Sequence, residues 1–115
     1  MRINLLPGAM ETRALPRMRP RAQRVAKKYR ISGRVQGVGF RYFAERAAHG
    51  LGLGGYVRNC PDGTVEVYAI GEPSTLEVFR LQLAEGPRSA RVAAVEERDE
   101  PVNDVYAAFR VEGVW

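Results

Sequence analysis

Residues 29–51 read YRISGRVQGVGFRYFAERAAHGL, and the spacing of their apolar residues changes at a glycine-containing loop. Before the loop, small or apolar residues alternate with polar ones, which is the period of a strand with one buried face. This buried set is Tyr29, Ile31, Gly33 and Val35. After the loop, the apolar residues follow the period of a helix and are Phe40, Phe43, Ala44, Ala47, Ala48 and Leu51. We therefore predict a strand from residue 27, a loop over residues 36–39 and a helix from about residue 40.

The end of this helix is predicted at His49 and Gly50. Gly50 suits the left-handed position that follows many helices, because glycine has no Cβ to clash there. His49 would then lie near the negative end of the helix dipole. We interpret His49 as a helix-end residue rather than a catalyst.

Two further strands and a second helix are predicted from the next segment of the chain. A strand over residues 55–59 is followed by the turn sequence Pro-Asp-Gly at 61–63 and by an alternating strand in which Val65, Val67 and Ala69 face inward. Residues 74–77, Ser-Thr-Leu-Glu, have the spacing of a helix capping box, and Gly86-Pro87 would end that helix.

The remaining residues predict a strand over 90–98 and a short last strand whose buried set is Ala107, Phe109 and Val111. The order β-α-β-β-α-β predicts a ferredoxin-like α+β sandwich, in which an antiparallel sheet carries two helices on one face and a short extra C-terminal strand. The first crossover makes the first two strands parallel. The loop at 36–39 and Asn59 would therefore meet at one edge of the sheet.

The formal charge of +5 is concentrated at the N-terminus of this 115-residue chain. Residues 1–26 hold six arginines and one glutamate, so that 6 − 1 = +5, and the remaining residues hold 12 basic and 12 acidic groups. We predict that residues 1–26, which contain Pro7, Pro16 and Pro20, are a disordered extension and that residues 27–115 are the domain. Because the domain is neutral, no nucleic-acid partner is expected.

The composition gives no indication of a metal site, a cofactor or a membrane segment. Cys60 and His49 are the only cysteine and histidine, which excludes an internal disulfide and a structural zinc site. No apolar run approaches the roughly 20 residues that span a membrane. We expect a cytoplasmic monomer that uses no metal or cofactor.

The loop at residues 36–39 has the chemistry of an anion site. Gly37 and Gly39 can turn backbone N–H groups inward, and the start of the following helix adds unpaired donors. Arg41, in the first helical turn, could bind two phosphoryl oxygens, although a surface pair with Glu45 is equally compatible with its spacing. Asn59 could hold a water or a substrate oxygen, or could simply be a turn residue.

The segment GRVQGVGFRYFAERAAHGLGLGGYVRNCPDGTVEVYAIG, residues 33–71, resembles the acylphosphatases. The motifs VQGV-x-FR and G-(aromatic)-V-x-N-x-x-DG-x-V carry the resemblance, which extends more loosely over residues 27–115; Tyr56 stands where many members have tryptophan. The resemblance implies that Arg41 binds phosphate and that Asn59 positions the attacking water. It also implies a backbone cradle made by Gln36, Gly37, Val38, Gly39 and Phe40.

The resemblance implies a hydrolase that converts an acyl phosphate to a carboxylate and inorganic phosphate by direct attack of water, without a metal. A non-catalytic module that binds phosphate or carbamoyl phosphate remains an alternative. An RNA-binding ferredoxin-like domain is a weaker one, because the third strand, GTVEVYAIG, carries only one aromatic residue, Tyr68. These motifs address the phosphoryl group and assign no residue to the acyl group.

Overall fold

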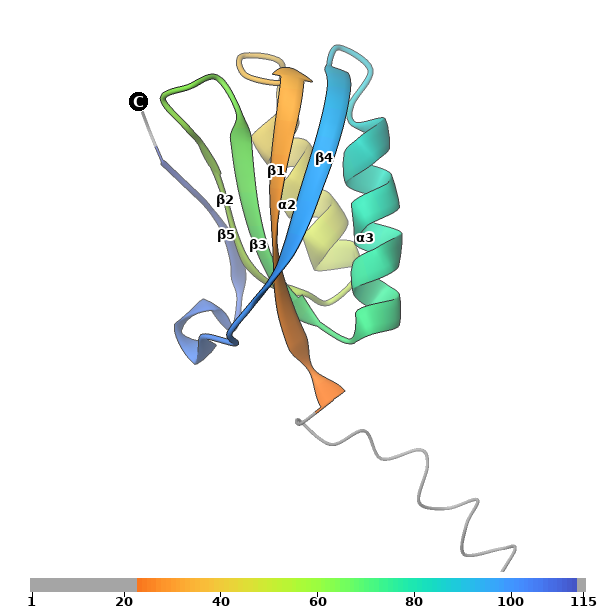
Figure 1. Cartoon of the computed structure of the whole chain (residues 1–115), viewed down its shortest axis with the longest axis vertical. Coiled ribbons are helices and arrows are strands. Elements are labelled where there is room, and N and C mark those ends of the chain that lie inside the picture. Colours follow the sequence, from red (N-terminus) through yellow and green to blue (C-terminus); the bar gives the residue numbers. More distant parts are fainter. Residues whose placement is uncertain (1–22, 114–115) are drawn as a thin grey trace, which may run out of the picture.

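The computed structural model describes residues 23–113, which form one five-stranded sheet covered on one face by two α-helices (Figure 1). In chain order the elements are β1 (Val25–Arg34), α2 (Phe40–Gly50), β2 (Gly54–Asn59), β3 (Val65–Gly71), α3 (Pro73–Glu85), β4 (Arg91–Glu100), the 3-10 helix η4 (Asp104–Tyr106) and β5 (Phe109–Glu112). The predicted ferredoxin-like α+β order is confirmed. Neither α-helix in this part of the chain is long and apolar enough to span a membrane.

The strands lie in the order β4-β1-β3-β2-β5, with β1 antiparallel to both of its neighbours. β2 is also antiparallel to β3, so β1 and β2 run in the same direction as predicted. The extra strand β5 pairs in parallel with β2, and the sheet is therefore mixed rather than wholly antiparallel. The physical reason is the connection: the chain reverses after β4, passes through η4 and enters the far edge in the direction of β2.

The core lies between the sheet and the helices. Tyr29 and Ile31 of β1 are fully buried, as the alternation predicts, and the helical stripe contributes Phe40, Ala44 and Ala48. Phe79 of α3 lies at the centre, where its ring meets Tyr29 edge-on at 6.0 Å and Phe109 at 6.1 Å between centroids. This core fixes the helices on the strands whose ends form the cavity described below.

The prediction that Gly33 lies on the buried face of β1 is wrong. The pairing of β1 with β4 shifts register between Ser32 and Gly33, which breaks the alternation of faces. Gly33 is exposed with φ 122°, and a Cβ there would collide with the backbone carbonyl of Arg91. Glycine is therefore required by the bulge and by close approach of β4 rather than by the core.

The first helix ends later than predicted. Gly50 is its last residue and is absent from the glycines with positive φ, whereas Gly52 has φ 69°. Gly52 N–H donates to His49 O at 3.1 Å and Leu53 N–H donates to Ala48 O at 3.0 Å, which is the Schellman pattern. The left-handed residue is Gly52 because Leu51 packs partly against the core and continues the turn.

The predicted capping box of α3 does not form. The helix begins at Pro73 with Glu72 as its N-cap and has no side-chain cap, because proline occupies the first helical position ahead of Ser74. Glu77 instead accepts hydrogen bonds from Arg80. The predicted stop is confirmed, since Gly86 follows the helix with φ 70°.

The last predicted strand starts too early. Residues 104–106 form η4, which is capped by the side chain of Asn103, and Ala107 is exposed between η4 and β5. Only Phe109 of the predicted inward set is fully buried. At the other end, β1 begins at Val25, two residues before the predicted strand. The rest of the predicted extension, residues 1–22, lies outside the described residues.

Candidate active site

The glycine loop and the end of β2 meet at one cavity of about 220 Å³. The loop leaves the end of β1 and Asn59 ends β2, so the parallel direction of these two strands brings both to the same edge. The cavity is lined by Val35, Gly37, Gly39, Phe40, Arg41, Tyr42, Asn59 and Val111. Arg41 and Asn59, 18 positions apart in the sequence, are thus brought together.

The backbone of the loop offers unpaired donors at this cavity. Gly37 and Gly39 have φ of 72° and 81°, and Gly39 is the left-handed N-cap of α2 without a side-chain cap. No acceptor within the described residues takes a hydrogen bond from the N–H of Gly37, Val38 or Gly39. The first turn of α2 also contains no acidic residue. This edge is therefore suited to an anion.

The loop is held in place from both sides. The side chain of Gln36 donates from Nε2 to the carbonyls of Cys60 at 2.8 Å and Thr64 at 2.9 Å, which joins the loop to the β2–β3 turn. On the other side, Ser89 Oγ donates to Val38 O at 2.8 Å. The side chains of Gln36 and Val38 are not among the cavity lining, so any contribution they make to it comes from their backbone. Ser89 was not predicted to contribute, because it lies far from the glycine loop in the sequence.

Arg41 is half-buried, and its partners within the described residues are main-chain carbonyls. Its Nη1 donates to Gly113 O at 2.7 Å and lies 3.4 Å from Glu112 O. The surface pair with Glu45 is not among these contacts. Nη1 donates to both carbonyls, whereas Nε and Nη2 have no partner within residues 23–113 and remain available for a ligand in the cavity.

Asn59 presents a buried acceptor with no partner. Its Oδ1 is buried and accepts no hydrogen bond within the described residues. A buried polar atom left in this way costs about 1–3 kcal/mol, so such atoms in folded proteins usually serve a ligand or a water. The alternative of a pure turn residue does not account for this atom.

The turn that follows Asn59 is held by its own residues. Asp62 Oδ1 accepts from Thr64 N at 3.0 Å and from Thr64 Oγ1 at 2.6 Å, and these bonds lower the pKa of Asp62. Cys60 N–H donates to Thr64 O at 2.9 Å. Asp62 and Cys60 therefore shape the turn that carries Asn59, as the sequence analysis predicted for Asp62.

His49 lies away from the cavity. Its Nε2 is 3.0 Å from Phe109 O, so the ring bridges the last turn of α2 to β5. This position agrees with the interpretation of a helix-end residue. Within residues 23–113, no three side chains of histidine, cysteine, aspartate or glutamate come close enough together to hold a metal ion.

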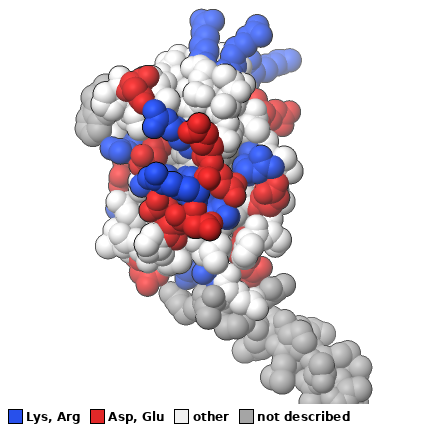
Figure 2. Space-filling view, viewed as in Figure 1, with Lys and Arg blue, Asp and Glu red and all other residues white. Residues whose placement is uncertain are grey.

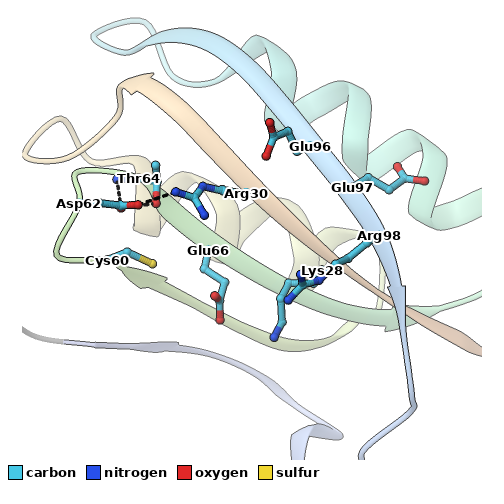
Figure 3. Close-up of a pocket in the computed structure, with 9 residues that line it drawn as sticks. All are labelled: Lys28, Arg30, Cys60, Asp62, Thr64, Glu66, Glu96, Glu97 and Arg98. Carbon is cyan, nitrogen blue, oxygen red and sulfur yellow. Dashed lines mark hydrogen bonds and ion pairs between the residues drawn. The ribbon is translucent and has the colours of Figure 1, made fainter.

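A second cavity, of about 300 Å³, lies on the sheet face away from the helices. Figure 2 shows basic and acidic side chains interleaved over this face, and Figure 3 shows the residues that line the cavity. Arg30 pairs with Asp62, and Glu66 accepts from Arg58 at 3.2 Å and from Tyr56 at 2.6 Å. Because these charges largely satisfy one another, we assign this cavity no ligand.

Comparisons with known proteins agree with this geometry. A family model described as Acylphosphatase matches residues 27–111, a range that includes every residue lining the first cavity. An acylphosphatase of Koribacter versatilis is 48% identical over 89 residues, which are 77% of this chain and 81% of the relative. A solved acylphosphatase from Coxiella burnetii matches with a TM-score of 0.75 at 36% identity and covers 79% of this chain and 95% of that one. Full-length HypF in its phosphate- and nucleotide-bound form matches with a TM-score of 0.71 at 29% identity, covering 79% of this chain and 12% of that one.

Proposed function

Because this chain belongs to the acylphosphatase family, we propose that the cavity beside the glycine loop is where it hydrolyses acyl phosphates. The activity is that of an acid anhydride hydrolase. The observation that supports the assignment to this cavity is that Arg41 lines it together with Asn59, whose buried Oδ1 has no partner within the described residues. In such a hydrolysis a cation binds the non-bridging phosphoryl oxygens, and a polar group holds the water opposite the leaving acyl oxygen; Arg41 and Asn59 have the chemistry for these two roles.

The loop and Arg41 are proposed to hold the phosphoryl group. The backbone N–H groups of residues 36–40 would bind its oxygens, and Arg41 would add charge-assisted hydrogen bonds, each worth about 1.5–3 kcal/mol. The carbonyl of Gly113 restrains the guanidinium before substrate arrives. Because negative charge is spread over the phosphoryl oxygens in the transition state, donors fixed in this way lower the barrier.

Asn59 is proposed to orient the attacking water. Its Oδ1 would accept a hydrogen bond from the water, whose oxygen attacks phosphorus in line with the bond to the acyl oxygen. The P–O bond to the acyl group breaks, the carboxylate leaves with the bonding electrons, and the water's proton passes to a phosphoryl oxygen of the substrate. The proposal includes no metal or cofactor.

The test is turnover of benzoyl phosphate by protein treated with a chelator. Arg41→Gln removes a transition-state donor and Asn59→Ala removes the acceptor that orients the water, and each should lower kcat by about a hundredfold or more. Arg46→Gln, an exposed arginine of the same helix, is the matched control and should retain wild-type turnover. Wild-type turnover in both Arg41→Gln and Asn59→Ala would show that the site lies elsewhere.

A non-catalytic module is the second candidate. The match to a small part of HypF in a phosphate-bound form shows that a domain of this fold also occurs within a much larger chain. Competitive binding of inorganic phosphate with no turnover of acetyl or benzoyl phosphate by the wild type would favour this candidate over an enzyme.

We also propose that the protein acts as a cytoplasmic monomer without a nucleic-acid partner. On the open sheet face, Tyr56 and Tyr68 stack at 5.5 Å and Tyr106 packs against both, with Tyr68 only 5% exposed. Rings engaged with one another in this way offer little face to a base, which weighs against the RNA-binding alternative.

A further inference from the structure

The lining of the proposed active site divides into two kinds of surface. The polar part consists of the loop backbone, Arg41 and Asn59, all of which are proposed to bind the phosphoryl group or the water. The apolar residues among the lining are Val35, Phe40, Tyr42 and Val111. An acyl phosphate has a polar end and an organic end, so the apolar part of the cavity is where the organic end would lie.

Most of these apolar residues are largely buried in or against the protein core. Val35 and Phe40 are each 1% exposed and belong to the main core, and Val111 is half-buried and packs against that core. Tyr42 differs, because it is 67% exposed. Its ring also makes no contact with any other aromatic ring in residues 23–113. Among the apolar lining residues, Tyr42 has the most surface free for a ligand.

The position of Tyr42 in α2 places this free surface beside the phosphate site. Tyr42 is the third residue of the helix and directly follows Arg41, while the buried face of the helix is formed by Phe40, Ala44 and Ala48. Arg41 is restrained by its hydrogen bond to Gly113 O. The backbone position of Tyr42 therefore places this residue in the cavity lining directly beside the proposed phosphoryl site, where a specificity-determining side chain would lie.

We propose that Tyr42 forms the wall against which the acyl group of the substrate packs, and that the enzyme consequently prefers acyl phosphates with aromatic or bulky apolar acyl groups over short ones. This inference rests on the proposed function of the cavity. A planar acyl group could stack on the tyrosine ring or meet it edge-on, a contact typically worth a few-fold to about tenfold in binding. An acetyl group is too small to cover the ring.

The experiment measures kcat/KM for benzoyl phosphate and for acetyl phosphate with wild type, Tyr42→Ala, Tyr42→Phe and the control Leu81→Ala. Leu81 is a comparably exposed apolar residue, 55% exposed on α3 and outside the cavity lining. In Tyr42→Ala, the ratio of kcat/KM for benzoyl to acetyl phosphate should fall about three- to tenfold. Tyr42→Phe keeps the ring and should keep the wild-type ratio, as should Leu81→Ala.

Inhibition by inorganic phosphate separates the acyl wall from the phosphoryl site. Phosphate has no acyl group, so its inhibition constant should change less than twofold in Tyr42→Ala. An unchanged benzoyl-to-acetyl ratio in Tyr42→Ala would overturn the inference while leaving the proposed function standing. An equal loss for both substrates with weaker phosphate inhibition would also overturn it, because Tyr42 would then act through the helix start or Arg41. Absence of turnover in the wild type would instead remove the proposed function and this inference with it.

Discussion

At the scale of single residues, Gln36 contributes to the site without lining the cavity. Its amide joins the loop that leaves β1 to the turn that follows β2 through two hydrogen bonds of 2.8 and 2.9 Å. Arg41 and the loop donors lie on one side of this link and Asn59 lies on the other. Gln36 is therefore a positioning residue that sets the separation between the proposed phosphoryl site and the proposed water site.

The replacement Gln36→Ala should remove the link between the glycine loop and the turn that follows Asn59. The loss of two hydrogen bonds should lower the free energy of unfolding by about 1–3 kcal/mol, at roughly 0.5–1.5 kcal/mol for each bond. A small displacement of Asn59 should also lower kcat by more than tenfold while phosphate inhibition changes less, because the donors of the loop remain. Urea unfolding and steady-state kinetics measure the two effects.

Ser89→Ala is the control for Gln36→Ala, since it removes one hydrogen bond to the same loop, at Val38 O, without releasing the β2–β3 turn. Its kcat should stay close to wild type. A Gln36→Ala protein that loses stability but keeps full kcat would show that the link is structural only.

At the scale of elements, the glycine loop shows which features a local pattern can predict. Gly37 and Gly39 were expected to turn donors inward, and both have positive φ. A Cβ at either position would have open space around it. Backbone conformation, rather than crowding, therefore accounts for glycine at these two positions.

Gly39→Ala tests this reading of the loop. Alanine in a left-handed conformation costs about 1–2 kcal/mol, so the variant should be destabilised by that amount or should shift φ at the helix N-cap. A shift would turn the N–H groups of the loop away from the cavity and weaken competitive inhibition by inorganic phosphate. Gly50→Ala, at the last residue of the same helix where φ is not positive, is the matched control and should do neither.

Glu66 of β3 makes a pH-dependent contribution to the stability of the folded protein. Burial alone would raise the pKa of Glu66, but hydrogen bonds from Tyr56 and Arg58 outweigh burial and hold this pKa below its ordinary value of 4.5. A carboxyl with a depressed pKa in the folded state stabilises that state above its ordinary pKa. This stabilisation is lost as the pH falls through the folded-state pKa.

The stability of Glu66→Gln should consequently depend less on pH in the acid range. Urea unfolding at pH 6 should show wild type to be more stable than Glu66→Gln, and at pH 3 the difference should shrink. Glu85→Gln, at the exposed end of α3, provides the comparison and should follow the wild-type profile. A constant difference between wild type and Glu66→Gln at both pH values would refute the assignment.

At the scale of the whole molecule, the core is organised around one aromatic side chain. Phe79 contacts Tyr29 of β1 and Phe109 of β5. It therefore connects α3 to two strands that are separated by β3 and β2 in the sheet. Phe79→Ala should lower the free energy of unfolding by about 3–5 kcal/mol, as is usual for deletion of a buried ring. Thermal unfolding followed by circular dichroism measures this. Val78→Ala, an exposed neighbour on the same helix, should cost far less.

The periodicities of the sequence predicted most of this architecture because each buried face repeats locally. Tyr29, Ile31 and Val35 face the core as their alternation required. The exceptions arise from contacts between distant segments. The bulge at Gly33 depends on the approach of β4, and the parallel pairing of β5 depends on the route the chain takes after β4. Neither is visible in a local pattern.

The candidate site likewise has features that the sequence predicted and features that depend on contacts between distant segments. The glycines of the loop indicated an anion site, whereas the roles expected of Arg41 and Asn59 came from the resemblance to the acylphosphatases, because their spacing alone fits surface and turn positions equally well. The direction of β1 and β2 brings all three to one cavity. The contact of Arg41 with Gly113 O could not be predicted, because the acceptor is a main-chain carbonyl, which every residue possesses, 72 positions away. Tyr42 likewise fits a plain helix-surface position until the cavity is known.

The bond between Arg41 and the carbonyl of Gly113, the residue that follows β5, ties the proposed phosphate-binding side chain to an edge strand. β5 is four residues long and pairs with only one neighbour, β2. Short edge strands detach by local opening more easily than strands within a sheet. Detachment of β5 would release the guanidinium, remove Val111 from the cavity and withdraw Phe109 from its contact with Phe79. Loss of activity would then report fraying of the last strand before the sheet as a whole unfolds.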